Sequence, residues 1–76
     1  MKYRQNKSAI KAFGLHLKKV RKSKAVTQEE LAFRTGLELS QIGRIERGVI
    51  NTSISNVFDI AKALKISPKD LFEFKY

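Results

Sequence analysis

The chain has 76 residues, of which 42% are hydrophobic and 30% charged, and its formal net charge is +9. This length allows one small domain with a single core, and the composition is that of a folded chain. With no cysteine and one histidine, a disulfide framework is excluded, and zinc or redox chemistry is disfavoured. The longest uncharged stretch, about ten residues, falls far short of the roughly 20 apolar residues that span a bilayer. We therefore expect a cytoplasmic protein with no membrane segment, no metal and no cofactor.

The positive charge is concentrated at the N-terminal end. Residues 1–24 hold nine of the sixteen basic residues and no acidic one, whereas residues 25–76 hold seven of each and sum to zero. A concentrated positive field suits a polyanion such as nucleic acid. A solvated basic tail is one alternative. A membrane-surface helix is another, but the few apolar residues of this segment are needed by the core.

The hydrophobic pattern predicts five helices and no strand. Residues 1–8 are polar and basic without periodicity, which is typical of a flexible arm, and a single domain follows over residues 9–76. The first helix is expected over about residues 9–23, with Ser8 as its N-cap. Its apolar stripe consists of Ile10, Phe13, Leu17 and Val20.

Capping and stop residues define four further helices. The second is short and begins at a capping box, the third covers about residues 39–47, and the last two each begin at a serine. The signals are, in chain order, Thr27 with Glu30, Gly36, Gly48, Ser53, and Ser67 with Pro68 and Asp70. The apolar residues that the last two helices carry are Ile54, Val57, Phe58, Ala61, Leu64, Leu71 and Phe72.

The second and third helices fit the helix-turn-helix pattern, in which two short helices flank a turn that contains glycine. Small or apolar residues stand where the helices meet, at the turn, and where the third helix reaches the core. These residues are Leu31, Ala32, Gly36, Leu37, Ile42 and Ile45. A purely structural helical hairpin could show any two of them, but all six beside a basic segment favour DNA binding.

The chain resembles the lambda-Cro and repressor-type (xenobiotic-response-element, XRE) helix-turn-helix family in the runs FGLHLKKVR, TQEELAFRTGLELSQIGRIERG and NTSISNVFDIAKALKISPKDLF. The likeness covers about residues 9–74. It implies an all-α, compact five-helix lambda-repressor-like domain from a bacterium or phage that binds double-stranded DNA and regulates transcription. A closer likeness, in FG, QEELA, ERG and NTSI-x-NV, is to the controller proteins of restriction-modification systems.

The resemblance implies base contacts from the third helix, because the second helix of the motif lies in the major groove in this family. The implied base-reading residues are Leu39, Ser40, Gln41 and Arg44. Arg44 can bind guanine O6 and N7, Gln41 can pair with adenine N6 and N7, and Leu39 can touch a thymine methyl. At 100° per residue, Gly43 and Arg47 share the outward direction of Ser40 and Arg44.

Phosphate contacts are implied at the start of the second helix and after the third. Gln28 lies where free backbone N–H groups and the helix dipole favour an anion. The implied phosphate-contacting residues are Lys22, Thr27, Gln28, Arg47, Asn51 and Thr52. The segment around Asn51 and Thr52 is alternatively only a turn before a helix cap.

Two further features follow from the resemblance. Arg21 and Glu46 match positions that form an ion pair in related repressors, so we expect a partly buried pair. The fourth and fifth helices form a two-fold interface in related proteins, so we expect a homodimer whose interface contains Phe72, Phe74 and Tyr76. Such a dimer is expected to bind an inverted-repeat operator. Phe72 and the preceding Leu71 are alternatively part of the monomer's own core. We expect no domain for a small-molecule effector.

Two residues depart from the family pattern, and a second function is open. Glu38 stands where a Ser or Thr N-cap is usual. Gly43 lies in the middle of the third helix, where glycine lowers helix stability by about 1 kcal/mol relative to Ala. Close approach to DNA or neutral drift would account for a glycine at this position. His16 is expected on the exposed side of the first helix, and without a catalytic set no enzyme is expected. The alternative is a protein-interaction module, such as an antitoxin or adaptor, with Phe33 as an exposed anchor unless it packs on Val26.

Overall fold

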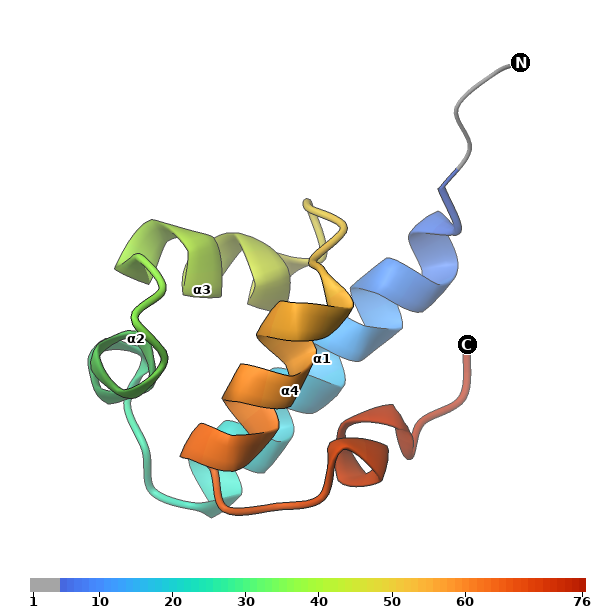
Figure 1. The fold of residues 1–76 in the computed structure, drawn as a ribbon. Helices are drawn as coiled ribbons and strands as arrows, with labels where there is room; N and C mark the ends of the chain where they lie inside the picture. Colours follow the sequence, from blue (N-terminus) through green and yellow to red (C-terminus); the bar gives the residue numbers. More distant parts are fainter. Residues whose placement is uncertain (1–4) are drawn as a thin grey trace.

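The computed structural model describes residues 5–76, which form four α-helices, a 3-10 helix and no strand. In chain order the elements are α1 (Lys7–Ser23), α2 (Gln28–Thr35), α3 (Leu39–Arg47), α4 (Ile54–Ala63) and the 3-10 helix η1 (Pro68–Phe72) (Figure 1). α1 packs on α3 and η1, while α2 packs on α3 and α4. The predicted all-α class is confirmed.

The fifth predicted helix is a 3-10 helix rather than an α-helix. It has five residues, and the Asp70 N–H donates to the Ser67 carbonyl at 2.9 Å, three residues back. The Ser67 N–H in turn donates to the Asp70 carboxylate at 3.1 Å. A 3-10 helix is typical of so short a segment, because its hydrogen bonds join residues i and i+3 and need fewer residues than the i to i+4 bonds of an α-helix. The predicted start is therefore right, and the expected count of five helices is reached only when this short 3-10 helix is counted.

α1 begins at Lys7, with Asn6 rather than the predicted Ser8 as its N-cap. The Asn6 side-chain oxygen accepts a hydrogen bond from the Ala9 N–H at 3.0 Å. An Asn is as good an N-cap as Ser, and placing the cap here adds residues 7 and 8 of the predicted arm to the helix. Residues 1–4 of that arm lie outside the described part of the chain.

α2 begins and ends as the sequence predicts. The Thr27 hydroxyl accepts from the Glu30 N–H at 3.0 Å, and the Glu30 carboxylate accepts from the Thr27 N–H at 3.2 Å. Gly36 ends the helix in the left-handed conformation, with φ 77°. Because glycine adopts this φ without strain, the chain turns directly into α3. The two helices of the motif are therefore held at a fixed angle.

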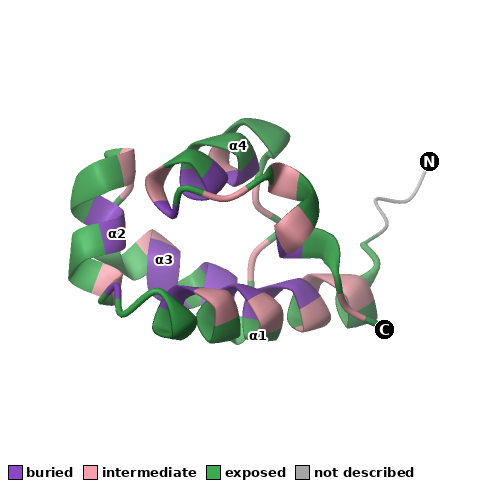
Figure 2. Cartoon of the chain, turned by 90° about the horizontal axis from the view of Figure 1, so that it is seen from below, coloured by how far each residue is buried: buried purple, intermediate pink, exposed green. Residues whose placement is uncertain are grey.

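Buried side chains line the helix faces that look toward one another (Figure 2). The largest fully buried side chains are those of Leu17, Leu31, Ile42, Ile45, Ile60 and Leu71. The apolar residues named for the fourth helix do not all reach the core, because Ile54 and Phe58 are 67% and 56% exposed, whereas Ile60 is fully buried. Phe58 is one residue past the buried Val57, and one residue turns a helix by about 100°. Two large apolar side chains of α4 therefore face outward.

The C-terminal segment folds back over α1. Leu71 of η1 is fully buried, and the His16 ring Nε2 lies 2.7 Å from the Asp70 carbonyl. His16 is half-buried and 5.7 Å from the Phe74 ring, between ring centroids. The prediction that His16 lies on the exposed side is therefore wrong, since the helical pattern of α1 alone does not reveal that η1 covers it.

Candidate nucleic-acid interface

The exposed face of α3 carries three of the four predicted base-reading residues. Ser40 and Arg44 are exposed, and Leu39 is 46% exposed. Ile42 and Ile45 are buried on the opposite side and anchor the helix to the core. α3 lies along one edge of the fold (Figure 1), and the exposure of Ser40 and Arg44 leaves this face accessible to a partner.

Gln41, the fourth predicted base reader, is half-buried at the edge of that face. Its side-chain Oε1 accepts a hydrogen bond from the Glu38 N–H at 3.1 Å. This bond holds the first turn of α3, whose N–H groups have no partner within the helix. Glu38 itself is the exposed N-cap of α3.

A buried ion pair joins α1 to α3. The Arg21 Nε lies 2.6 Å from Glu46 Oε2, and Arg21 Nη2 donates to Glu46 Oε1 at 3.0 Å, so the contact is bidentate. Arg21 Nη1 also donates to the Val26 carbonyl at 2.9 Å. Arg21 and Glu46 are only 6% and 4% exposed. The hydrogen bonds that Arg21 donates to the Glu46 carboxylate raise the pKa of Arg21 above its ordinary value, so the guanidinium stays charged throughout the physiological range.

Gln28 belongs to the same network. Its side-chain Nε2 donates to Glu46 Oε1 at 2.9 Å, and this fixes the side chain at the first residue of α2. The N–H groups of that first turn carry the positive end of the helix dipole. The network therefore ties together the end of α1, the start of α2 and the body of α3. The family resemblance implied the pair of Arg21 and Glu46, but no signal in the sequence indicated that Gln28 joins them.

Two glycines let α1 and α3 meet backbone to backbone. A Cβ added at Gly14 of α1 would lie 2.7 Å from the Glu46 carbonyl oxygen and still closer to that of Ile45. A Cβ at Gly48, just after α3, would lie 2.5 Å from the Lys11 Cα. No side chain fits either gap. Gly14 was not identified from the sequence, although a glycine beside an apolar stripe in mid-helix is a signal of such a contact.

Gly43 lies on the outward side of α3, as its helical position predicts, but a neighbouring side chain covers it. It is buried, and a Cβ there would lie 3.0 Å from Arg47 Nη1. The Arg47 side chain folds back along α3, so its guanidinium covers the glycine one turn earlier. The direction of Gly43 was predicted correctly from its angle, but its exposure was not, because the angle ignores the neighbouring arginine.

The other predicted phosphate-contacting residues have differing environments. Lys22 and Asn51 are exposed. The Thr27 hydroxyl is engaged in the α2 cap, and the Thr52 hydroxyl accepts from Asn56 Nδ2 at 3.1 Å. Asn51 and Thr52 therefore belong to the turn that leads into α4, and only Asn51 of the two is exposed there.

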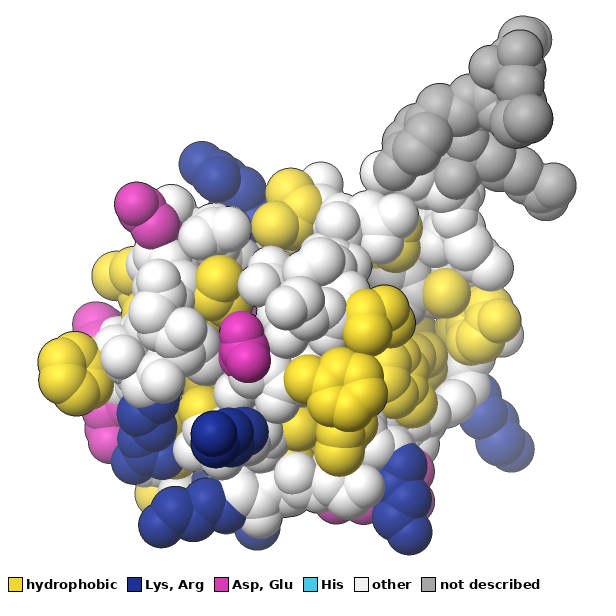
Figure 3. Space-filling model, viewed as in Figure 1, with side chains coloured by type: hydrophobic (Ala, Val, Ile, Leu, Met, Phe, Trp, Pro, Cys, Tyr) yellow, Lys and Arg dark blue, Asp and Glu magenta, His cyan; other side chains and the backbone are white. Residues whose placement is uncertain are grey.

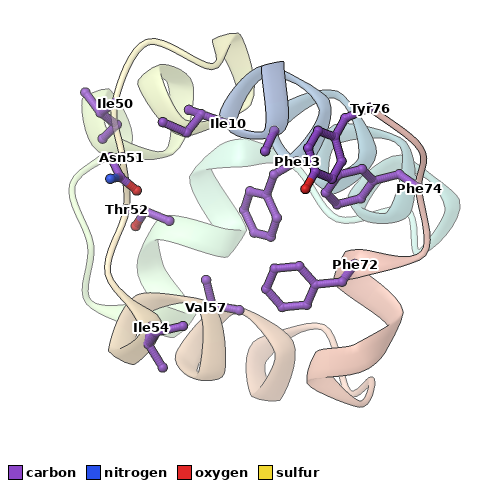
Figure 4. Close-up of a pocket in the computed structure, with 11 residues that line it drawn as sticks. Ile10, Phe13, Ile50, Asn51, Thr52, Ile54, Val57, Phe72, Phe74 and Tyr76 are labelled. Atoms are coloured by element: carbon purple, nitrogen blue, oxygen red, sulfur yellow. The ribbon is translucent and has the colours of Figure 1, made fainter. Parts of the chain in front are cut away.

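An apolar groove lies on another side of the molecule, between α1, the loop before α4, and the C-terminal segment. Phe72 and Tyr76 line it at 49% and 74% exposed, while Phe74 is half-buried against the core. The Phe13 and Phe72 rings lie 5.4 Å apart between centroids (Figure 4). Hydrophobic side chains gather over α4 and toward this groove in Figure 3. Leu71 closes the monomer's core, whereas Phe72 does so only in part.

Phe33 stands apart from every one of these clusters. It is 89% exposed on α2, so the predicted alternative of packing against the buried Val26 is wrong. Within residues 5–76, no group of three or more His, Cys, Asp or Glu side chains could hold a metal ion. No described helix has both the length and the apolar character to cross a membrane.

Known proteins resemble this chain in sequence and in structure. The helix-turn-helix family HTH_3 matches residues 17–71, more than half of the chain. Control protein C.BamHI of Bacillus amyloliquefaciens is 44% identical over 63 residues, which cover 82% of this chain and 78% of that protein.

Solved structures give the same picture. The restriction-modification controller protein C.AhdI of Aeromonas hydrophila is 43% identical, with a TM-score of 0.80 over 86% of this chain and 97% of that one. The clp gene regulator ClgR of C. glutamicum is 28% identical, with a TM-score of 0.81 over 84% of this chain and 83% of that one. By their names these are regulatory and control proteins and not enzymes.

Proposed function

We propose that this chain, which belongs to the XRE-type helix-turn-helix family, is a sequence-specific regulator that binds double-stranded DNA as a homodimer on an inverted repeat. Family membership confirms the resemblance noted in the sequence. The observation that carries the proposal is the exposed polar face of α3, which a buried ion pair holds at a fixed angle to α1. A rigid helix with its polar face outward is what insertion into a major groove requires.

Base recognition is assigned to the face of α3. Arg44 is free to make two hydrogen bonds with guanine, and Leu39 offers an apolar contact for a thymine methyl. Gln41 can donate from its NH₂ group while its oxygen stays on the Glu38 N–H. Recognition of adenine by both ends of the amide would require that cap bond to open. Ser40 completes the set at the centre of the exposed face.

Backbone contacts are assigned to the residues around α3. Gln28 and Thr27 lie at the start of α2, where an anion is favoured, and the bond from Gln28 to Glu46 links a phosphate contact to the ion pair. Arg47, Asn51, Thr52 and Lys22 supply further contacts. These contacts position the protein, whereas the α3 face selects the sequence.

The apolar groove is assigned to the two-fold interface. Tyr76, Phe72 and Ile54 are large exposed apolar side chains that line one groove. A second copy of the chain would cover them, and two copies present two recognition helices to two half-sites. The relatives named as control proteins of restriction-modification systems support the same role for this chain.

A protein-interaction module remains the second candidate, because Phe33 is 89% exposed on α2. Selection from a randomised duplex pool separates the two functions. A regulator enriches an inverted repeat with half-sites about 34–36 Å apart, and its affinity falls steeply as salt rises. A chain that enriches no sequence and binds duplexes weakly at all salt concentrations is instead an interaction module.

A further inference from the structure

A hollow lies between α1 and α3, and its α1 residues are ones to which the family resemblance assigns no DNA contact. Lys11 and Lys18 of α1 border it on one side, and Gly43, Glu46 and Arg47 of α3 border it on the other, with Gln28 at the start of α2. Leu15 and Val49, which are 60% and 63% exposed, complete its rim. The lysine stems can run along these apolar side chains and leave the ammonium groups in water.

The close approach of the two helices fixes the place of this hollow. Gly14 and Gly48 bring the α1 backbone against the end of α3. An adjacent face of α1 therefore lies beside α3. Lys11, Leu15, Lys18 and Lys22 follow i, i+4, i+7, i+11 spacing and share that face. The Cβ and Cγ atoms of Lys11 pack against Gly48, so this side chain starts out next to the end of α3.

The charge of the hollow is positive. Lys11, Lys18 and Arg47 each contribute a cation, and Glu46 is the carboxylate that borders the hollow. Both oxygens of that carboxylate are engaged, Oε2 by Arg21 and Oε1 by Arg21 and Gln28. The charge of Glu46 is therefore neutralised inside the network, and it does not offset the three cations.

The dimensions of DNA give this hollow a ligand. An α-helix with its side chains is about 10–12 Å across, close to the roughly 12 Å width of the major groove. When α3 enters the groove, the phosphates therefore run along its flanks. The hollow lies on one of these flanks, beside Gly43 and Arg47 on the edge of the exposed face.

We propose that the hollow bordered by Lys11, Lys18 and Arg47 binds a phosphate of the DNA backbone, so that α1 grips the strand alongside the helix-turn-helix. This proposal rests on the proposed function of DNA binding and extends it to residues of α1. Lys22 continues the same row of lysines one turn further along. Contacts from α1 to the phosphates would then limit how deeply α3 inserts into the major groove.

The test uses the full-length protein and the duplex that selection enriches. Lys11→Gln and Lys18→Gln each remove one cation from the hollow, and Lys62→Gln removes one from the exposed surface of α4 as the matched control. Binding to the selected duplex and to a random duplex is measured over a range of salt. Each hollow variant is expected to flatten the slope of log affinity against log salt by about 0.9, the value for one phosphate contact, and to weaken both duplexes by the same factor. Lys62→Gln is expected to leave the slope unchanged.

Lys11→Arg keeps the charge beside Gly48 and guards against a purely structural effect. It is expected to retain the wild-type slope, and the melting temperatures of all variants are expected to match the wild type. Slopes for Lys11→Gln and Lys18→Gln equal to that of Lys62→Gln overturn the proposal while the regulator itself still binds. If the wild-type protein enriches no duplex, the proposed function fails first, and the hollow proposal fails with it.

Discussion

Two sides of the molecule differ in the surface that they expose and in the contacts beneath it. On one side α1 meets α3, and on the other α4 meets the C-terminal segment. The first is joined by a bidentate buried ion pair and by two glycines that bring backbones into contact, and it exposes basic and polar residues. The second has its core sealed by Leu71 but leaves Ile54, Phe58 and Tyr76 more than half exposed.

This difference indicates two kinds of partner. A polar surface held by a rigid interior suits a charged ligand whose groups must be met at fixed positions. A groove with exposed aromatics gains stability only when another apolar surface covers it. The α1–α3 side is accordingly the one we propose for DNA, and the groove is the one we propose for a second copy of the chain. The following predictions test these two assignments separately.

The largest effect is expected at the ion pair. Arg21→Ala or Glu46→Ala should lower the free energy of unfolding by about 3–5 kcal/mol, because each leaves the other charge buried without its partner. Chemical denaturation measures this change. The matched control is Arg34→Ala, which removes the exposed pair with Glu30 at 3.5 Å and an exposed hydrogen bond to the Ala63 carbonyl at 3.1 Å, and it should cost about 1 kcal/mol or less. Equal effects in the two pairs would show that burial does not distinguish them.

The next effect concerns the groove. Tyr76→Ser should weaken self-association by roughly 10- to 30-fold, about 1.4–2 kcal/mol, because a large aromatic is lost from the interface. Sedimentation over a range of protein concentrations measures the dimer. Phe33→Ser is the matched control, since Phe33 is still more exposed but lies on α2, outside the groove. A wild-type protein that stays monomeric at tens of micromolar would contradict the assignment of the groove.

An effect of similar size is expected on DNA recognition. Arg44→Ala should weaken binding to the selected duplex by about 1–3 kcal/mol and relax the preference at one base position, because it removes a bidentate contact with guanine. Its effect on self-association should be nil. Competition binding with single-base variants of the duplex measures both the loss and the relaxed position. If Arg44→Ala weakened random DNA equally, Arg44 would be a phosphate contact instead.

Local signals in the sequence were sufficient for most of the fold. The Thr27 and Glu30 capping box, Gly36, Gly48 and Ser53 each mark a helix end that the structure has at the same residue. These signals act within a few residues and need no knowledge of the rest of the chain. The same holds for the buried direction of α3, which follows from Ile42 and Ile45.

The failures concern contacts between distant segments. His16 is covered by η1, which lies 54 residues further along the chain at Asp70, and Gln28 is joined to Glu46 by a bond over 18 residues. Phe58 faces outward because the core is filled from Ile60 instead. Helical periodicity identifies a face but does not tell what covers it, so these environments required the tertiary structure.

The smallest effect compares two mid-helix glycines on the α1–α3 side. Gly43→Ala should raise the free energy of unfolding by up to about 1 kcal/mol, because alanine is the better helix former and the new methyl group meets only the mobile end of Arg47 at 3.0 Å. Gly14→Ala should have the opposite sign, since its methyl group would collide with the carbonyl oxygens of α3, which cannot move without the helix. Thermal and chemical denaturation of both variants measure the two signs. A loss of stability in Gly43→Ala would contradict this expectation. It would mean that displacing the Arg47 guanidinium from its place over residue 43 costs more than the helix preference of alanine contributes.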